Sequence, residues 1–520
     1  MDNSKSDQQR TRREFLKDMG GVAVLASGAT LLPGCGGGGG SEPLSTQRQL
    51  ELTATDAVQA IKNGDVSAEA YVTTLLDRHD RLKSLNTVIS LDRNAVLEAA
   101  RGVDNQRRNG TPLGALAGLP LLIKDNIDVA GVPCTAGSRG LATNRPQKNA
   151  PVMNPLLSAG ALVMAKGNMH ELAFGITSTN SAYGFVKNPY NTLMIPGGSS
   201  GGPAAAVAAR IAPAGLGTDT GGSMRIPPAL CGVVGLRPTV GNGPKRYPGA
   251  GVVPISHTRD TVGSMARTVA DVALLDSVIT STVMPTARTL TGLRIGIPRA
   301  YFWEDLDPEL AVVMNDALKR IASLGVVLVE VDLVGLKDLN DKIGFPVALY
   351  EANLDIPAYL AAGSSGITFD QVVAQITSKD VQGAIGAART FPQAPYDEAI
   401  NIHRPQLQKL YADYFINNGV AAMLFPTTPL PARPINQNGD TGADTVELNG
   451  QQVPEFGTYI RNTDPGSNAG LPGLSMPAGM TKSGLPVGME LDGPVGSDQT
   501  LLAIGMALEK TFAPLPAPNV

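Results

Sequence analysis

The sequence predicts an α/β protein in which residues 46–520 fold as one large domain. Short apolar runs typical of buried strands alternate with longer segments whose apolar residues recur at helical spacing, as in layered α/β folds. Hydrophobic residues make up 43% of the chain and charged residues 17%, which is a globular composition. Because no repeat and no linker-like stretch follows residue 45, we expect one domain rather than several.

The elements expected in the first half lead to a lysine at the end of a buried strand. The apolar run 119–123 predicts a strand that ends at Lys124, and a second strand is expected over residues 161–165. An alanine-rich helix is expected over residues 204–211, with Pro203 in its first turn. Helical spacing predicts further helices over residues 53–63, 67–82, 95–107 and 153–159.

The elements expected in the second half continue the alternation of helices and strands. The segment 337–410 is predicted to be mainly helical. Helical spacing also predicts helices over residues 267–279, 308–324 and 497–512. Apolar and β-branched runs predict strands over residues 293–298, 326–331, 421–427 and 485–491.

The first 45 residues are predicted to be a targeting segment and tether rather than part of the fold. Thr-Arg-Arg-Glu-Phe-Leu-Lys at residues 11–17 matches a twin-arginine export signal, and the apolar stretch 19–32 is too short to cross a membrane. Leu-Pro-Gly-Cys resembles a lipobox, so we expect residues 1–34 to be a signal peptide and Cys35 to carry a lipid. Residues 35–45 then form a glycine-rich tether. We therefore expect an exported protein at the periplasmic or cell-envelope face, touching the membrane only through its lipid.

Composition gives no sign of nucleic acid, metal or cofactor binding. The formal net charge of −4 does not favour nucleic acid as a partner. Cys134 and Cys231 are expected to be small core residues, and the sequence leaves open whether they pair. The four histidines show no metal-ligand spacing; they are His79, His170, His257 and His403.

Two serine-bearing glycine clusters and one lysine are the candidate catalytic residues. The clusters are Gly-Gly-Ser-Ser-Gly-Gly at residues 197–202 and Asp-Thr-Gly-Gly-Ser at residues 219–223. Glycine lets a backbone approach a ligand closely or adopt positive φ. Lys124 follows an apolar run, and burial favours the neutral form of lysine, which is a base. A nucleophilic serine, a second serine and a neutral lysine can hydrolyse an amide without histidine.

In this order and spacing, the motifs resemble the amidase signature family from about residue 50 onward. Ser199 and Ser223 lie 24 residues apart, as the family pattern requires. The resemblance implies a single α/β/α domain with a mixed central sheet covered by helices. Besides the Lys124 segment, the matching segments are residues 128–131, 197–202, 217–227, 259–273 and 470–491.

The same resemblance assigns the catalytic roles. It makes Ser223 the nucleophile that forms an acyl-enzyme, with Ser199 relaying protons to neutral Lys124. It also implies a cis peptide bond before Ser199, and it requires no metal or organic cofactor. The backbone N–H groups expected to form the oxyanion hole are those of Thr220, Gly221, Gly222 and Ser223. Supporting polar roles are expected for Ser200, Asp219 and Arg225.

Three alternative functions compete with this interpretation. Gly-x-Ser-x-Gly at residues 197–201 also fits the nucleophile elbow of an α/β-hydrolase esterase, with Ser199 as nucleophile and His257 or His403 as its partner. That alternative leaves Lys124 and Ser223 without a role. An exported solute-binding lipoprotein explains residues 1–45 but none of the motifs. The family's glutamyl-tRNA transamidating subunit is cytoplasmic, and the export signal argues against it.

The substrate is expected to be a small primary amide, cleaved to acid and ammonia. The segments 350–360 and 369–380 look like those of aryl-acetamide hydrolases that act on indoleacetamide or mandelamide, which favours an arylalkyl amide. A small-molecule amide is therefore the expected partner. The sequence indicates neither the stereochemical preference nor the oligomeric state.

Overall fold

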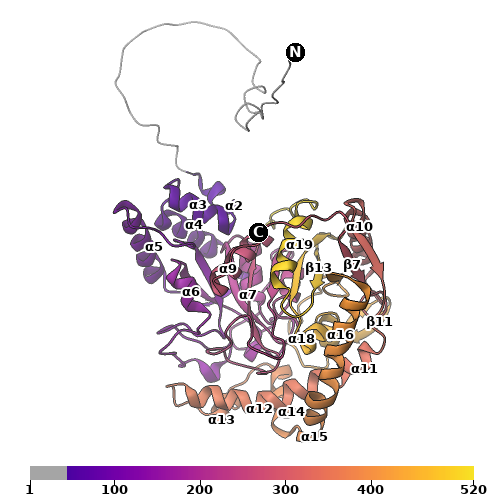
Figure 1. Ribbon diagram of the computed structural model, residues 1–520. Helices are drawn as coiled ribbons and strands as arrows, with labels where there is room; N and C mark the ends of the chain where they lie inside the picture. Colours follow the sequence, from indigo (N-terminus) through magenta and orange to yellow (C-terminus); the bar gives the residue numbers. More distant parts are fainter. Residues whose placement is uncertain (1–43) are drawn as a thin grey trace, which may run out of the picture. The chain divides into compact units, whose positions relative to one another are not determined.

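The centre of the protein is an 11-stranded mixed sheet, seen in the computed structural model that describes residues 44–520 (Figure 1). Strands β2, β3 and β4 run parallel, as do β7, β8 and β9, and the remaining neighbours are antiparallel. This arrangement confirms the predicted α/β class with a mixed central sheet. In spatial order the strands are β1 (Val88–Ser90), β3 (Leu162–Gly167), β2 (Pro120–Lys124), β4 (Ala214–Asp219), β6 (Thr261–Ala266), β5 (Val234–Arg237), β12 (Gly473–Met480), β13 (Pro486–Asp492), β9 (Ala422–Pro426), β7 (Arg294–Ile297) and β8 (Val327–Glu330).

Helices cover the sheet and begin where polar side chains cap them. The side chains of Thr53, Ser67 and Thr268 each accept a hydrogen bond from a first-turn N–H group, which satisfies a donor that the helix itself cannot pair. The helices are α2 (Thr46–Glu51), α3 (Ala54–Asn63), α4 (Ala68–Arg81), α5 (Arg93–Arg108), α6 (Met153–Ser158), α7 (Gly201–Ala208), α8 (Ile226–Cys231), α9 (Val269–Thr280), α10 (Pro308–Ser323), α11 (Leu336–Asp341), α12 (Gly344–Ala362), α13 (Phe369–Val373), α14 (Lys379–Thr390), α15 (Gln393–Glu398), α16 (Arg404–Asn418), α17 (Glu455–Ile460), α18 (Asp464–Ala469) and α19 (Asp498–Glu509).

The predicted elements are confirmed to within a few residues, with one shifted helix, but several strands and short helices were missed. The helix expected over residues 204–211 begins earlier, at Gly201, and ends at Ala208. The strands that were not predicted are β1, β4, β5, β6 and β12, together with the hairpin of β10 (Thr445–Leu448) and β11 (Gln451–Pro454). The short helices α2, α8, α17 and α18 were not predicted either. The sequence pattern therefore located the helices better than the central strands.

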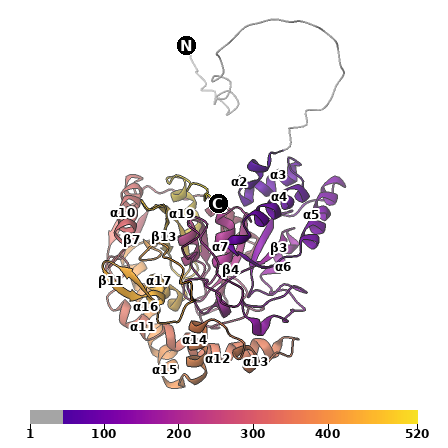
Figure 2. The ribbon, with the colours of Figure 1, turned by 180° about the vertical axis from the view of Figure 1, so that it is seen from behind.

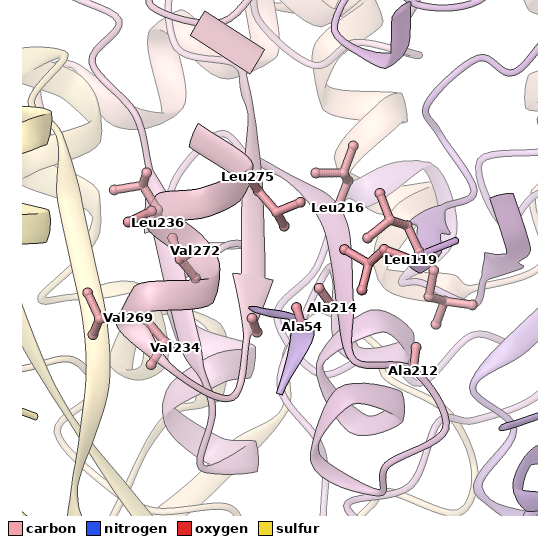
Figure 3. Close-up of a cluster of buried hydrophobic side chains, with 14 of the residues drawn as sticks. Ala54, Leu119, Ala212, Ala214, Leu216, Val234, Leu236, Val269, Val272 and Leu275 are labelled. Carbon is pink, nitrogen blue, oxygen red and sulfur yellow. The ribbon is translucent and has the colours of Figure 1, made fainter. Parts of the chain in front are cut away.

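The two faces of the sheet pack against different helices. In β6, Ala266 joins the cluster that contains Val272 of α9, whereas its neighbour Met265 joins the cluster that contains Val207 of α7. Because successive strand residues point to opposite faces, α9 and α7 lie on opposite sides of β6. Figure 3 shows the α9 side, where Val269, Val272 and Leu275 meet strand residues such as Leu236, and Figure 2 shows α7 beside β4.

Two further expectations concern the cysteines and the export and lipidation of the chain. Within residues 44–520, Cys134 and Cys231 are buried and form no disulfide, so they are core residues as expected. The export signal and Cys35 lie outside the described residues, and their roles stay predictions. Within residues 44–520, every helix is too short or too polar to cross a bilayer.

Candidate active site

Lys124 lies at the carboxyl end of β2, next to the end of the parallel strand β4. Its side chain is completely buried. Nζ lies 2.7 Å from Ser199 Oγ and 2.7 Å from Thr218 Oγ1. Thr218 Oγ1 also accepts a hydrogen bond from Asn126 Nδ2 at 3.1 Å. Strand packing and two hydroxyl groups therefore hold the amine against Ser199.

Burial lowers the pKa of Lys124 from its ordinary value to about 7, although the more distant carboxylates of Asp219 and Asp260 act in the opposite direction. Near neutral pH a large share of the amine is therefore uncharged. A neutral amine has a lone pair, and at 2.7 Å it is within reach of the Ser199 hydroxyl proton. The apolar run before Lys124 in the sequence predicted that the pKa of this lysine would be lowered.

Ser199 is held between β4 and the start of α7. The Gly198–Ser199 peptide bond is cis, as the family resemblance implied. Ser178 Oγ fixes both sides of this turn, because it donates to Gly197 O at 2.9 Å and accepts from Gly201 N at 3.2 Å. Ser199 is completely buried. Its neighbour Ser200 donates to Thr218 O at 3.2 Å instead of capping α7 with its side chain.

The loop between β4 and α8 carries Ser223 and, beside it, several backbone N–H groups that have no hydrogen-bond acceptor among the described residues. Within residues 44–520, none of the N–H groups of residues 220–223 donates a hydrogen bond. The loop is held from behind instead, by Thr220 Oγ1 donating to Asp260 at 2.6 Å and by Thr463 Oγ1 donating to Gly221 O at 2.6 Å. Gly222 has a φ of 147°, a backbone conformation that favours glycine. Free donors on a fixed loop are the arrangement that an oxyanion hole needs.

Ser223 is the accessible member of the predicted triad. Its exposed fraction is 8%, whereas those of Ser199 and Lys124 are 0%. Ser223 lines a cavity of about 690 Å³, together with Thr220 and Gly221. The hydrogen bond expected between Ser199 and Ser223 is absent from residues 44–520, in which Ser223 Oγ has no hydrogen-bond partner at all. The predicted relay is therefore in place from Lys124 to Ser199, and its last contact is not formed.

A buried ionic network supports the loop from beneath. Arg225 contacts Asp219 through Nε at 3.0 Å and Glu490 through a second guanidinium nitrogen at 2.6 Å, and Arg237 contacts Asp219 at 2.7 Å. Burial alone would raise the pKa of Asp219, but Arg225 and Arg237 together hold it well below its usual range. Asp219 and Arg225 thus anchor the two ends of the loop, which fits their predicted supporting role.

Replacing Arg225 by methionine is expected to lower the free energy of unfolding by about 3–5 kcal/mol, because it leaves buried Glu490 without its cation and leaves Asp219 with Arg237 alone. Urea titration measures this loss. The matched control is Arg299→Met, since Arg299 pairs with Glu330 on the surface, where the side chains are 40% and 60% exposed. The free energy of unfolding of Arg299→Met is expected to fall by less than about 1 kcal/mol. Equal losses in the two variants would show that the buried network does not stabilise the fold.

The cavity beside Ser223 has mainly apolar walls from three helices. Phe345, Ala348 and Leu349 come from α12, and Phe456 and Ile460 come from α17. Figure 1 shows α12 and α14 together at one edge of the described unit. Helix α14 contributes Asp380, Gly383 and Ala384.

Sequence reasoning missed several residues that position the site. Thr218 and Asn126 orient Lys124, and Ser178 fixes the turn at Ser199. Asn126 lies in the same short motif as Lys124, which was a usable signal. Arg237 and Glu490 carry no local signal, because their partners are distant in the chain. No histidine side chain hydrogen-bonds Ser199 Oγ within residues 44–520, and His257 pairs instead with Asp355 and Glu351.

Comparison with known proteins gives a consistent result over most of the chain. The family model described as Amidase matches residues 70–502. An indoleacetamide hydrolase from Rhizobium radiobacter is 45% identical over 471 residues, covering 88% of this chain and 98% of that protein. A mandelamide hydrolase from Pseudomonas putida is 38% identical over 487 residues, covering 90% and 93%.

Solved structures show the same similarity in three dimensions. The peptide amidase from Stenotrophomonas maltophilia aligns with a TM-score of 0.77 and 27% identity, covering 90% of this chain and 98% of that one. A structure described as an amidase aligns with a TM-score of 0.79 and 30% identity, covering 89% of this chain and all of the other.

Proposed function

The chain belongs to the amidase signature family, and from this premise we propose that it hydrolyses an arylalkyl primary amide through an acyl-enzyme on Ser223. The observation that carries the choice of nucleophile is the difference in access. Ser223 opens onto the cavity beside unpaired N–H groups, whereas Ser199 is completely buried against the Lys124 amine. A substrate carbonyl can therefore reach Ser223 but cannot reach Ser199.

The proposed mechanism uses only side chains and backbone of this chain. Neutral Lys124 takes the proton of Ser199, which takes the proton of Ser223 as the Ser223 oxygen attacks the amide carbon. This sequence requires the Ser223 side chain to turn toward Ser199 when substrate binds. The N–H groups of residues 220–223 stabilise the negative charge on the carbonyl oxygen. The proton returns through the same groups to the leaving nitrogen, ammonia departs, and water repeats the sequence on the ester.

Two observations support the arylalkyl substrate class. The relatives at 45% and 38% identity are named indoleacetamide hydrolase and mandelamide hydrolase. The cavity of about 690 Å³ is lined by Phe174, Phe345 and Phe456, and both the size and the aromatic lining suit a small aromatic ligand.

A panel of primary amides tests this substrate class by ammonia release. We expect kcat/KM for indole-3-acetamide or phenylacetamide to exceed that for acetamide by about 10²-fold or more, because the apolar cavity binds the ring in the transition state. Methyl esters of the same acids serve as a control for acyl transfer. Turnover of acetamide as efficient as that of the aryl amides would contradict the proposed substrate class.

A further inference from the structure

One wall of the cavity carries four carboxyl groups that the proposed mechanism does not use. Asp380 lies on α14, Asp440 and Asp444 lie between β9 and β10, and Glu455 is the first residue of α17; all four line the cavity. Carboxylate oxygens of Asp440, Asp444 and Glu455 lie within 4.8 Å of one another. An oxygen of Asp380 lies equally close to one of Asp440 and to a ring nitrogen of His170. We call these four carboxyl groups the acidic wall.

Three members of the acidic wall have protein partners. Asp380 pairs with His170 Nε2 at 2.7 Å. Asp440 accepts hydrogen bonds from the hydroxyl groups of two threonines, Thr177 and Thr179. Asp444 accepts from the Asn436 amide at 3.0 Å and from the backbone and side chain of residue 441. These bonds fix the three carboxylates in place.

Glu455 is different, because its carboxyl group has no partner. Its exposed fraction is 8%, and within residues 44–520 no donor forms a hydrogen bond with either carboxyl oxygen. Burial, and then the negative charges of Asp440 and Asp444, raise the pKa of Glu455 to about 8. Burying a carboxyl group without a hydrogen-bond partner costs free energy. A ligand that hydrogen-bonds to Glu455 would remove this cost.

The charge of the cavity favours a cation at this wall. The guanidinium of Arg259 also lines the cavity, but it is paired with Asp464. Among residues 44–520, the acidic wall is therefore left with a single basic partner, His170. A positively charged group that enters the cavity gains from this potential, and the gain is larger than on an open surface because Asp440 and Glu455 are buried.

We propose that the acidic wall is a subsite for an ammonium group at the non-reacting end of the amide substrate, with Glu455 as its direct hydrogen-bond partner. This inference rests on the proposed function and narrows it to arylalkyl amides that carry an amine. The aromatic body lies against Phe345 and Phe456, and the ammonium group reaches Glu455. A divalent metal ion is disfavoured because three of the four carboxylates are already engaged by protein donors, which leaves few free carboxylate oxygens beside the water that such an ion keeps.

Two pairs of isosteric substrates test the proposal. The probes are the meta and para isomers of (aminomethyl)phenylacetamide and the matching ethylphenylacetamides, assayed by ammonia release above pH 8, where most of the Glu455 carboxyl is ionised. In the wild-type enzyme we expect kcat/KM for the better amine isomer to exceed that for its ethyl analogue about tenfold or more. In Glu455→Gln this ratio is expected to fall about tenfold, because the variant keeps the shape and loses the charge.

The control is Glu398→Gln, which removes an exposed carboxylate on α15 and is expected to keep the wild-type ratio. A wild-type ratio near one, or an unchanged ratio in Glu455→Gln, overturns the subsite while turnover of the ethyl analogue leaves the proposed function standing. If none of the four compounds releases ammonia, the proposed function itself is wrong. If millimolar calcium stabilises the wild-type enzyme against heat and not Glu455→Gln, the acidic wall binds metal and the proposal is also wrong.

Discussion

Replacing Ser223 by alanine is expected to lower kcat for every amide substrate by about 10⁶-fold, the size of loss found when a serine nucleophile is removed from a serine hydrolase. The variant keeps the oxyanion N–H groups but has no oxygen to form the acyl-enzyme. Single-turnover ammonia release measures the loss. The matched control is Ser323→Ala, an exposed serine at the end of α10, which is expected to keep full activity.

Removing the other serine distinguishes the two roles. Ser199→Ala breaks the contact with the Lys124 amine and is expected to be severely impaired as well, yet it retains the Ser223 hydroxyl. The proposed roles are wrong if Ser223→Ala retains measurable amide turnover while Ser199→Ala has none.

Replacing Lys124 by arginine is expected to lower kcat/KM at neutral pH by at least about 10³-fold, because guanidinium does not release its proton in this range and cannot act as a base. Lys124→Met removes the amine with a side chain of similar length, and it should be at least as impaired. The control Lys337→Arg changes an exposed lysine on α11 and is expected to have no effect. Circular dichroism and the urea midpoint show whether each variant is folded.

The pH dependence of the wild-type enzyme tests the same base. The active form contains the neutral amine, which predominates above the lysine pKa of about 7. We therefore expect kcat/KM to rise with pH through an ionisation near that value and then to level off. A profile that is flat between pH 5 and pH 9 would eliminate Lys124 as the base.

The sequence was sufficient to predict the strand position and burial of Lys124 because the signals are local. The apolar run before Lys124 predicts both the strand and the lowered pKa, and the structure places the residue at the end of β2 with its pKa near 7. Helical periodicity likewise located α3, α4 and α10 to within a residue or two. Each of these features depends on neighbours in the chain.

Strand β4 was missed because close packing, rather than β-propensity, requires glycine at two of its positions. A Cβ at Gly217 would lie 2.6 Å from both Ser200 Oγ and Met224 Sδ, and one at Gly215 would lie 2.8 Å from Leu122 O. Glycine is unfavourable in strands, so propensity argues against a strand at the very positions where the fold requires a close approach. The contacts that require glycine are visible only in three dimensions.

Apart from Ser200, Asp219 and Arg225, the residues that support the site could not be predicted, for a related reason. Glu490 reaches Arg225 across 265 positions of the chain, and the acidic wall assembles residues from α14, α17 and the segment between β9 and β10. No spacing rule connects such groups, because tertiary packing alone brings them together. Recognisable motifs predicted the candidate catalytic residues, and the structure was needed to find the groups that contact them and that line the cavity.

The central claim is that Ser223, rather than Ser199, forms the covalent intermediate. The most direct measurement is to react the wild-type enzyme with a fluorophosphonate, digest it, and locate the modified serine by mass spectrometry. We expect one label per chain on the peptide that contains Ser223, no label in Ser223→Ala, and slower labelling in Lys124→Arg because the relay that activates the serine is lost. A label on Ser199 that persists in Ser223→Ala would contradict the account.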